Sequence, residues 1–374
     1  MRYNSIWESE TFYRKRDIII IGAGFTGLWT ALSIREKFPQ KTVLVTERAS
    51  VPKGASTRNA GFACFGSLTE IIADSEKMGW EKTLELVRMR FEGLGKIQQY
   101  FKHDEIDFDL CGGYEILNDG TALEKIDDVN RRLRTITGLD QTYFLSPDKI
   151  AEFGLAHTKF LVENPLEGSL HSGKLLQKLI ERCHDAGVEF LFGSEVIDIQ
   201  ETEESVKVLG RDFQIESHRL VIATNAFAPD LVPDLDLVPA RGQILLTGPV
   251  HNLKLKGTFH FDEGFYYFRN IGNRVLLGGA RNLDFENEQT AELDTTGLVQ
   301  NHLETFLKEV ILPAEIYSDR NFRILGRWSG IMAMGSEKAP IVQRITDRQV
   351  CAVRLSGMGV ALAPKIGEMV AEMV

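Results

Sequence analysis

Residues 17–27 read DIIIIGAGFTG, and this stretch decides the class of fold. The run of four isoleucines, residues 18–21, is typical of a strand that is buried on both faces of a parallel sheet. The segment that follows it, residues 28–37, has helical composition, and residues 42–46 again read as a strand. The order strand, helix, strand predicts a right-handed βαβ unit of a doubly wound sheet.

The glycines of this stretch have the spacing of a dinucleotide-binding turn. Gly22 permits the tight turn, Gly24 lets the backbone approach a pyrophosphate, and Gly27 lets the helix pack against the strand. Glu47 follows about 20 residues beyond Gly27, where a carboxylate accepts the ribose hydroxyls and repels a 2′-phosphate. The pattern favours FAD or NAD over NADP, and the alternative is a turn with a purely structural role.

Residues 54–62, GASTRNAGF, favour FAD over NAD. An NAD-binding domain would begin its second crossover helix at this point. A loop of small and hydroxylated residues instead lets the backbone approach a bulky planar ligand.

Composition excludes several other classes of protein. The chain has 374 residues and a formal net charge of −10, which gives no overall basic footprint for nucleic acid. No apolar run is long enough to span a membrane, and the polar N-terminus does not read as a secretory signal. The eight histidines have no metal-ligand spacing, so no metal is expected. The four cysteines lie far apart, which indicates a reduced, cytoplasmic protein: Cys64, Cys111, Cys183 and Cys351.

The rest of the chain alternates between two kinds of pattern. Helix–strand alternation predicts an FAD-binding domain from residues 1–80, 155–238 and 335–374. Clustered strands predict a substrate domain from residues 81–154 and 239–334. The expected fold is therefore α/β (α+β overall), a Rossmann-like FAD-binding domain interleaved with an antiparallel-sheet substrate domain.

Four segments resemble the D-amino acid oxidase superfamily of FAD-dependent oxidoreductases, in its glycine and sarcosine oxidase group. They are residues 55–61 (ASTRNAG), 223–226 (ATNA), 239–243 (PARGQ) and 356–364 (SGMGVALAP). Short matches around Trp7, in the STRNAGF loop and at residues 328–330 look most like the gamma-glutamylputrescine oxidoreductase branch.

The resemblance implies a set of FAD contacts. Its expected members are Gly22, Gly24, Phe25, Thr26, Gly27, Glu47, Arg48, Ala55, Ser56, Thr57, Asn59, Ala60, Gly61, Val196, Ala223, Thr224, Gly357, Met358, Gly359, Val360 and Ala361. Some relatives attach the flavin covalently through a cysteine near the equivalents of Ala333 and Met334. Neither residue is a cysteine here, so non-covalent FAD is expected.

The substrate side departs from the family pattern. Met332 stands where glycine oxidase-like members carry an arginine for the substrate carboxylate, and Ala361 stands where sarcosine oxidase-like members carry a lysine. Residues 275–277 lack the lysine that is implicated in oxygen activation. The candidates for substrate contact are Tyr267, Arg269, Tyr266 and Met332 itself. On the strand YYFR, alternation places Tyr267 and Arg269 on one face and Tyr266 and Phe268 on the other. Sheet packing with a snorkelling arginine is the alternative interpretation.

These features predict an FAD-dependent oxidoreductase that oxidises a C–N bond of a small amine or amino acid by hydride transfer to the flavin. The family that the chain resembles uses no dedicated acid or base at a fixed position, so none is assigned. One alternative is a dehydrogenase that passes electrons to a quinone or carrier. Another is a non-redox flavin-binding subunit of a heteromeric amine dehydrogenase. The sequence does not define the oligomeric state.

Overall fold

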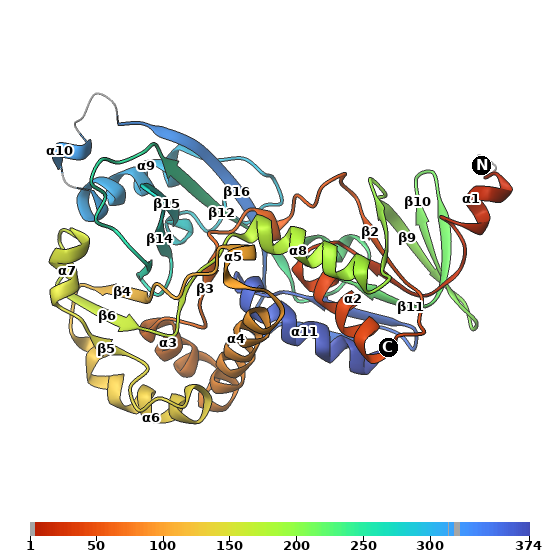
Figure 1. Ribbon diagram of the computed structural model, residues 1–374, viewed down its shortest axis with the longest axis horizontal. Helices are drawn as coiled ribbons and strands as arrows, with labels where there is room; N and C mark the ends of the chain where they lie inside the picture. Colours follow the sequence, from red (N-terminus) through yellow and green to blue (C-terminus); the bar gives the residue numbers. More distant parts are fainter. Residues whose placement is uncertain (1–3, 313, 318–321) are drawn as a thin grey trace. The chain divides into compact units, whose positions relative to one another are not determined.

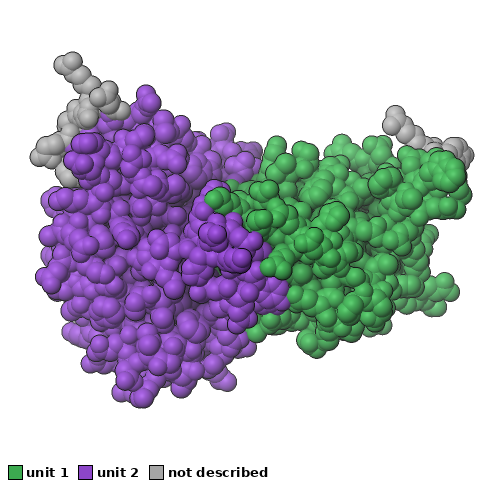
Figure 2. Space-filling view, viewed as in Figure 1, with its two compact units in different colours: residues 1–57, 173–240, 332–374 green, residues 58–172, 241–331 purple. Residues whose placement is uncertain are grey.

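The computed structural model describes residues 4–312, 314–317 and 322–374. The chain divides into two compact units, which Figure 2 colours separately. Unit 1 comprises residues 1–57, 173–240 and 332–374, and unit 2 comprises residues 58–172 and 241–331. The prediction of a mixed α/β fold whose two parts interleave along the chain is confirmed.

The boundaries between the units differ from the expected ones. Residues 58–80 and 155–172 were expected in the FAD-binding part, but they belong to unit 2. Two pairings inside that unit account for this: β3 (Phe62–Ala63) lies antiparallel to β7 (Gly168–Ser169), and residues 160–164 form a strand of the large sheet.

Unit 1 is a mostly parallel sheet with helices (Figure 1). Its elements are α1 (Ile6–Glu10), β1 (Arg16–Ile21), α2 (Phe25–Lys37), β2 (Val43–Glu47), η1 (Ala55–Thr57), α8 (Ser172–Asp185), β8 (Glu189–Phe192), β9 (Val196–Glu201), β10 (Val206–Gly210), β11 (Gln214–Ile222), η3 (Asn225–Asp230), β17 (Ile341–Arg344), β18 (Gln349–Val353) and α11 (Gly359–Met373). The strand order is β17-β18-β11-β1-β2-β8, and the β9–β10 hairpin extends from β11. The predicted first βαβ unit is confirmed.

Strand β1 occupies the middle of this sheet, parallel to β2 on one side and β11 on the other. Its isoleucines are buried, as a strand covered on both faces requires. Helix α2 packs against α11 at Gly367, where a β-carbon would lie 2.6 Å from the carbonyl carbon of Trp29. The helices therefore meet at backbone distance.

Unit 2 contains the second large sheet and a group of helices (Figure 1). Besides β3 and β7 its elements are α3 (Leu68–Met78), α4 (Trp80–Tyr100), α5 (His103–Ile106), β4 (Gly113–Leu117), η2 (Thr121–Lys125), α6 (Ile126–Thr137), β5 (Phe144–Leu145), α7 (Asp148–Phe153), β6 (Phe160–Asn164), β12 (Val238–Thr247), β13 (Thr258–Phe261), β14 (Tyr266–Ile271), β15 (Arg274–Gly279), η4 (Arg281–Leu283), α9 (Gly297–Phe306), η5 (Leu307–Ile311), α10 (Ala314–Tyr317) and β16 (Ile324–Met334). The strand order is β16-β12-β15-β14-β13-β4-β6-β5. The pairings β12–β15, β15–β14, β14–β13, β4–β6 and β6–β5 are antiparallel, as predicted, whereas β13 and β4 run parallel.

The two faces of this sheet differ in chemistry. Phe259 and Phe268 lie stacked on one face, within an apolar core that also takes in α9 and η5. The opposite face carries a row of paired residues across four strands: Glu115, His260, Tyr267 and Gly278. The chain segment 59–69 contacts this polar face, as the contacts below show.

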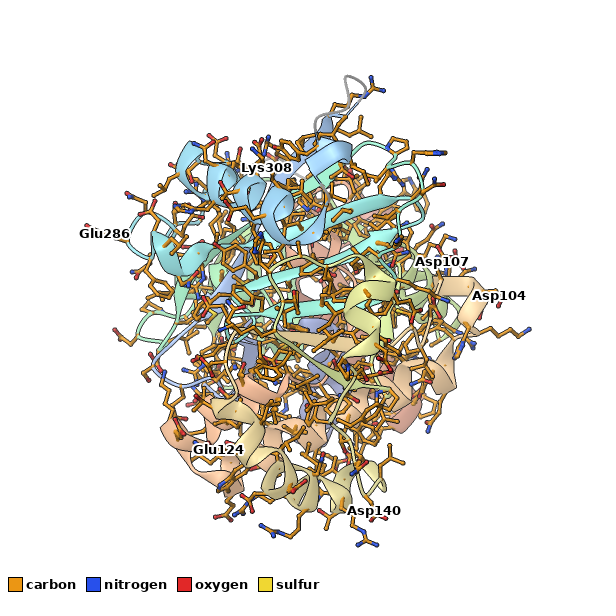
Figure 3. The ribbon with its side chains drawn as sticks, turned by 90° about the vertical axis from the view of Figure 1, so that its left-hand side faces the viewer. Asp104, Asp107, Glu124, Asp140, Glu286 and Lys308 are labelled. Carbon is orange, nitrogen blue, oxygen red and sulfur yellow. The ribbon has the colours of Figure 1, made fainter. Side chains whose placement is uncertain are left out.

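Two buried glutamates fix the second half of that segment. Glu167 accepts hydrogen bonds from the amides of Phe65 (2.7 Å) and Gly66 (3.1 Å). Glu115 accepts from the Ser67 hydroxyl (2.9 Å) and from both the amide and the hydroxyl of Thr69, at the first turn of α3. Burial raises the pKa of Glu115 to about 7 and the pKa of Glu167 to about 8. Charged residues such as Asp104, Glu124 and Lys308 lie instead at the outside of the unit (Figure 3).

The raised pKa values predict that the protein is less stable at high pH. The carboxyl pKa of each group lies well above its ordinary value of 4.5, so folding takes up protons between about pH 5 and 8. Stability is therefore present below this range and is lost as the pH rises through it. In Glu167→Gln the amide oxygen can still accept both backbone hydrogen bonds, and the decline should become shallower. Urea unfolding midpoints from pH 5 to 8.5 measure the effect.

Glu152→Gln is the control for this prediction, because Glu152 is exposed on α7. Its pH profile should match that of the parent protein. Equal slopes in the parent and in Glu167→Gln would show that Glu167 does not titrate in this range.

Candidate functional site

The turn between β1 and α2 leaves no room for side chains. Gly22 has φ +108°, and a β-carbon there would lie 2.7 Å from the carbonyl oxygen of Ala223. A β-carbon at Gly27 would overlap the carbonyl oxygen of Gly22. Gly24 is the N-cap of α2 and offers no capping side chain. The first turn of α2 has no acidic residue either, so its N-terminus can receive an anion.

Ser56 lies at the same helix start. Its hydroxyl oxygen accepts a hydrogen bond from the Phe25 amide at 2.9 Å, which brings the predicted residues of η1 to the glycine turn. A β-carbon at Gly24 would come within 3.1 Å of this oxygen. The Ser56 hydroxyl therefore lies directly against the glycine turn.

Glu47 ends β2 beside the same turn. Its carboxylate accepts from the amides of Ala23 and Ala49, each at 3.1 Å. A carboxylate has about four acceptor positions, so acceptor capacity remains for ribose hydroxyls. The neighbouring segment is fixed by a hydrogen bond from the Ser194 amide to the Glu47 carbonyl (2.9 Å), and Val196 then opens β9.

Arg48 takes a different role from its neighbour. Its guanidinium lies 3.9 Å from the ring centre of Phe227, in η3. The side chain is therefore held by a cation–π contact within unit 1.

Four buried hydroxyls of unit 1 have no hydrogen-bond partner in the described structure, those of Thr30, Ser217, Thr224 and Ser356, and two of them lie in segments that the family resemblance assigns to FAD. These two are Thr224, directly after β11, and Ser356, in the turn before α11. The amide of Ala223 donates to the Ile21 carbonyl (2.9 Å), which brings Thr224 to the end of β1. A buried polar atom without a partner is uncommon, and both hydroxyls are available to hydrogen-bond a bound group.

The turn at residues 356–358 leads into α11, whose N-cap is Met358. Gly357 has φ +84°, and a β-carbon on it would lie 3.4 Å from the sulfur of Met332. Met332 is therefore beside the turn that the family resemblance assigns to the flavin. Gly359, Val360 and Ala361 form the first turn of the helix.

These residues fit FAD. Unit 1 brings together the glycine turn, Glu47, residues 55–57, Val196, the Ala223–Thr224 pair and residues 357–361 at the carboxyl ends of parallel strands. This edge of a parallel sheet is where dinucleotides bind. The unpartnered hydroxyls and the open helix start are the features that a pyrophosphate-containing cofactor would satisfy.

The remaining predicted FAD contacts, Asn59, Ala60 and Gly61, belong to unit 2. Gly61 has φ +71°, and its amide donates to the side-chain oxygen of Asn59 at 2.8 Å. The Ser172 hydroxyl donates to the same oxygen at 2.5 Å. Residues 59–61, hereafter the cofactor loop, thus have a fixed conformation.

Tyr267 and Tyr266 lie on opposite faces of the unit 2 sheet, as the alternation predicts. Tyr266 belongs to the apolar core and stacks on Phe306 at 4.7 Å between ring centres. Tyr267 contacts Phe62 edge to face, and its ring covers Gly278, where a β-carbon would lie 2.5 Å from the ring. Burial raises the pKa of Tyr267 to about 12, so its hydroxyl stays protonated.

Arg269 lies on the same face as Tyr267, and its Nη1 atom donates to main-chain carbonyls. Nη1 lies 2.7 Å from the Gly61 oxygen and 2.9 Å from the Leu170 oxygen. Nε donates to the carbonyl of Asn270 at 3.2 Å. The guanidinium therefore contacts the cofactor loop directly.

Two further side chains lie near these segments and were not among the residues predicted from the sequence. His260 pairs across the strands with Tyr267, and neither of its buried ring nitrogens has a partner in the described structure. Burial lowers the pKa of His260 to about 4, so the ring is neutral. Arg354 precedes the turn at residues 356–358 and is held by Asp236 (2.6 Å) and by the Ala339 carbonyl (2.9 Å). Strand alternation could have singled out His260, whereas nothing local singles out Arg354.

No group of three or more His, Cys, Asp or Glu side chains within the described ranges is arranged to hold a metal ion. The cysteines are free, and Cys64 and Cys351 are buried as packing residues. In the described part of the chain, no helix has the length and apolar character needed to cross a membrane.

The fold and the glycine turn define a flavin-binding oxidoreductase. The chain matches the FAD dependent oxidoreductase family, DAO, over residues 17–373, and it belongs to that family. The predictions of the family and of FAD as the cofactor are thereby confirmed.

Individual relatives are distant. The chain is 26% identical to the probable oxidoreductase OrdL of Haemophilus influenzae, with 96% of this chain and 82% of the relative covered. It is 25% identical to gamma-glutamylputrescine oxidoreductase of Escherichia coli, with 96% and 83% covered.

Solved structures show the same fold. L-proline dehydrogenase from P. horikoshii superposes with a TM-score of 0.78 at 19% identity, covering 96% of this chain and 93% of the other. Glycine oxidase from Geobacillus kaustophilus gives a TM-score of 0.77 at 19% identity, covering 96% and 94%.

The purified protein should be yellow, and acid or heat should release intact FAD. The reason is the absence of a cysteine at the covalent position, where Ala333 and Met334 stand. Absorbance of the supernatant and of the precipitated polypeptide measures the release. Flavin that stays with the denatured chain would contradict non-covalent attachment.

Glu47→Ala should weaken FAD binding by about 1–3 kcal/mol, the range for losing a charged hydrogen-bond acceptor. Gly24→Val should weaken it further, because a branched side chain would fill the space next to Ser56 and the helix start. Fluorescence of released flavin on dilution measures both. Glu203→Ala, on the exposed β9–β10 turn, is the control. Unchanged FAD retention in both site variants would place the dinucleotide elsewhere.

Proposed function

We propose that this oxidoreductase oxidises a C–N bond of an amine or N-substituted amine. Bound FAD would supply the hydride acceptor for this oxidation, and water would hydrolyse the imine product to a carbonyl compound with release of ammonia or, from an N-substituted substrate, an amine. The single observation that carries the proposal is the glycine turn, with the Glu47 carboxylate and the Ala223–Thr224 pair beside it.

The chain's own residues would bind and orient the substrate rather than exchange protons with it. Tyr267 keeps its proton because its pKa is raised to about 12, so it can donate a hydrogen bond but cannot act as a base near neutral pH. His260 is neutral because its pKa is lowered to about 4. A substrate amine must lose its own proton before it can give up a hydride, and a desolvated site favours that neutral form.

Met332 supports amines over α-amino acids as substrates. A carboxylate that enters a desolvated site needs a fixed cation, because an unpaired buried charge costs several kcal/mol. Met332 stands at the position where glycine oxidase-like members carry their arginine, and its sulfur lies against Gly357. The similarity to a gamma-glutamylputrescine oxidoreductase fits this preference, whereas the similarity to a glycine oxidase favours amino acids.

A second candidate is a dehydrogenase that passes its electrons to a quinone or carrier. Residues 275–277 on β15 are buried Val, Leu and Leu. The lysine implicated in oxygen activation in sarcosine oxidase-like members is therefore missing from this strand. Slow reoxidation in air after reduction by substrate would favour this candidate over an oxidase.

Anaerobic bleaching of the flavin by matched pairs, an amine and its α-carboxylated analogue, tests the proposal. The amine should reduce the flavin faster. Met332→Arg should shift the ratio of the two rates toward the carboxylated partner by about tenfold, or about 1.4 kcal/mol. Met369→Arg adds the same charge at an exposed position of α11 and should leave the ratio unchanged.

Two outcomes would contradict the proposal. A carboxylated partner that reduces the parent enzyme tenfold faster would exclude the amine preference. A flavin that no member of a broad amine and amino-acid panel can bleach would favour the non-redox subunit instead.

A further inference from the structure

We propose that Arg269 is a positioning residue, which holds the cofactor loop (residues 59–61) on the sheet of unit 2 and does not anchor a substrate carboxylate. The inference rests on FAD lying against this loop, as the proposed function assumes. The main evidence for this role of Arg269 is that one guanidinium nitrogen, Nη1, donates hydrogen bonds to the carbonyls of both Gly61 and Leu170.

The two carbonyls belong to chain segments that are far apart in sequence. Gly61 ends the cofactor loop, and Leu170 follows β7 directly. The Leu170 amide donates back to the Gly61 carbonyl at 2.8 Å, so this oxygen accepts two hydrogen bonds. Arg269 therefore bonds to both chain segments at the end of the β3–β7 pairing, just before β3 begins and just after β7 ends.

The loop is tight at the point of contact. A β-carbon at Gly61 would overlap the Leu170 oxygen and would lie 2.9 Å from Nη1 of Arg269. With φ +71°, Gly61 also has a backbone conformation that other residues rarely adopt. The arginine and the glycine thus fit one another, and a displacement of either should move the loop.

This geometry leaves Arg269 poorly suited to bind a carboxylate. Bidentate recognition uses two parallel N–H groups of the guanidinium fork. Nη1 is directed at Gly61 and Leu170, and Nε donates to Asn270. The Nη1–Nη2 edge and the Nε–Nη2 edge each have one nitrogen committed to main-chain carbonyls.

Arg269→Met tests the inference in the holoenzyme. Loss of the charged donors should speed hydrogen exchange at the Leu170 amide by about tenfold or more and weaken FAD retention on dilution by a similar factor. The ratio of flavin reduction by an amine and its α-carboxylated analogue should stay within about twofold of the parent ratio. Arg274→Met removes the same charge from the start of β15 and should change none of these readouts.

Gly61→Ala disturbs the same contact through the loop and leaves the Arg269 guanidinium unchanged. It should also speed exchange at Leu170 and release FAD. Gly272→Ala is its control, because Gly272 has φ +58° but a β-carbon added to it would meet no other atom within 4 Å. The control carries the backbone strain without the overlap, and it should retain FAD as the parent does.

Two results would overturn the inference. In the first, Arg269→Met keeps the parent's hydrogen exchange and FAD retention, but its flavin is no longer reduced by the carboxylated analogue. Arg269 would then be the anchor for the substrate carboxylate. The other is parent-like exchange and FAD retention in both Arg269→Met and Gly61→Ala. Hydrogen exchange and FAD retention do not require the proposed substrate, so a failure to oxidise amines is distinguishable from a failure of the inference.

Discussion

The carbonyl oxygen of Gly22 leaves no space for a side chain at Gly27, and the arrangement of unit 1 depends on that close approach. Helix α2 can pack directly above β1 only because the two glycines meet backbone to backbone. The helix then begins just beyond the carboxyl end of β1. Since β2 and β11 run parallel to β1, Glu47 and Ala223 arrive at the same edge. One steric constraint thus brings a positive helix end, a ribose acceptor and the turn after β11 together.

Features with local determinants could be predicted from the sequence. The β1–α2–β2 unit was predicted correctly because its apolar run, its glycines and its acid lie within one short stretch. The alternation on β14 was also informative. Phe268 is fully buried in the core while Arg269 reaches the cofactor loop, as a period of two requires.

Features that depend on long-range partners could not be predicted. Glu167 binds the amides of Phe65 and Gly66 about a hundred residues earlier, and no local pattern marks a glutamate as buried. The expected domain boundaries differed from the compact units for a related reason. Strands β3 and β7 have two residues each, too few for a periodic signal, yet their pairing draws residues 58–80 into unit 2.

The polar face of the unit 2 sheet links the stability of that unit to the proposed chemistry. Glu115 holds the start of α3, and Arg269 holds the cofactor loop. Tyr267 and His260 lie on the same face, and both are neutral near pH 7 because burial disfavours their charged forms. Of the side chains described on this face, only Arg269 carries a full positive charge, and its guanidinium already donates hydrogen bonds to main-chain carbonyls. Under the proposed function, such a face would stabilise a neutral amine more readily than an α-carboxylate, because the carboxylate would have to displace existing hydrogen bonds to obtain a counter-charge.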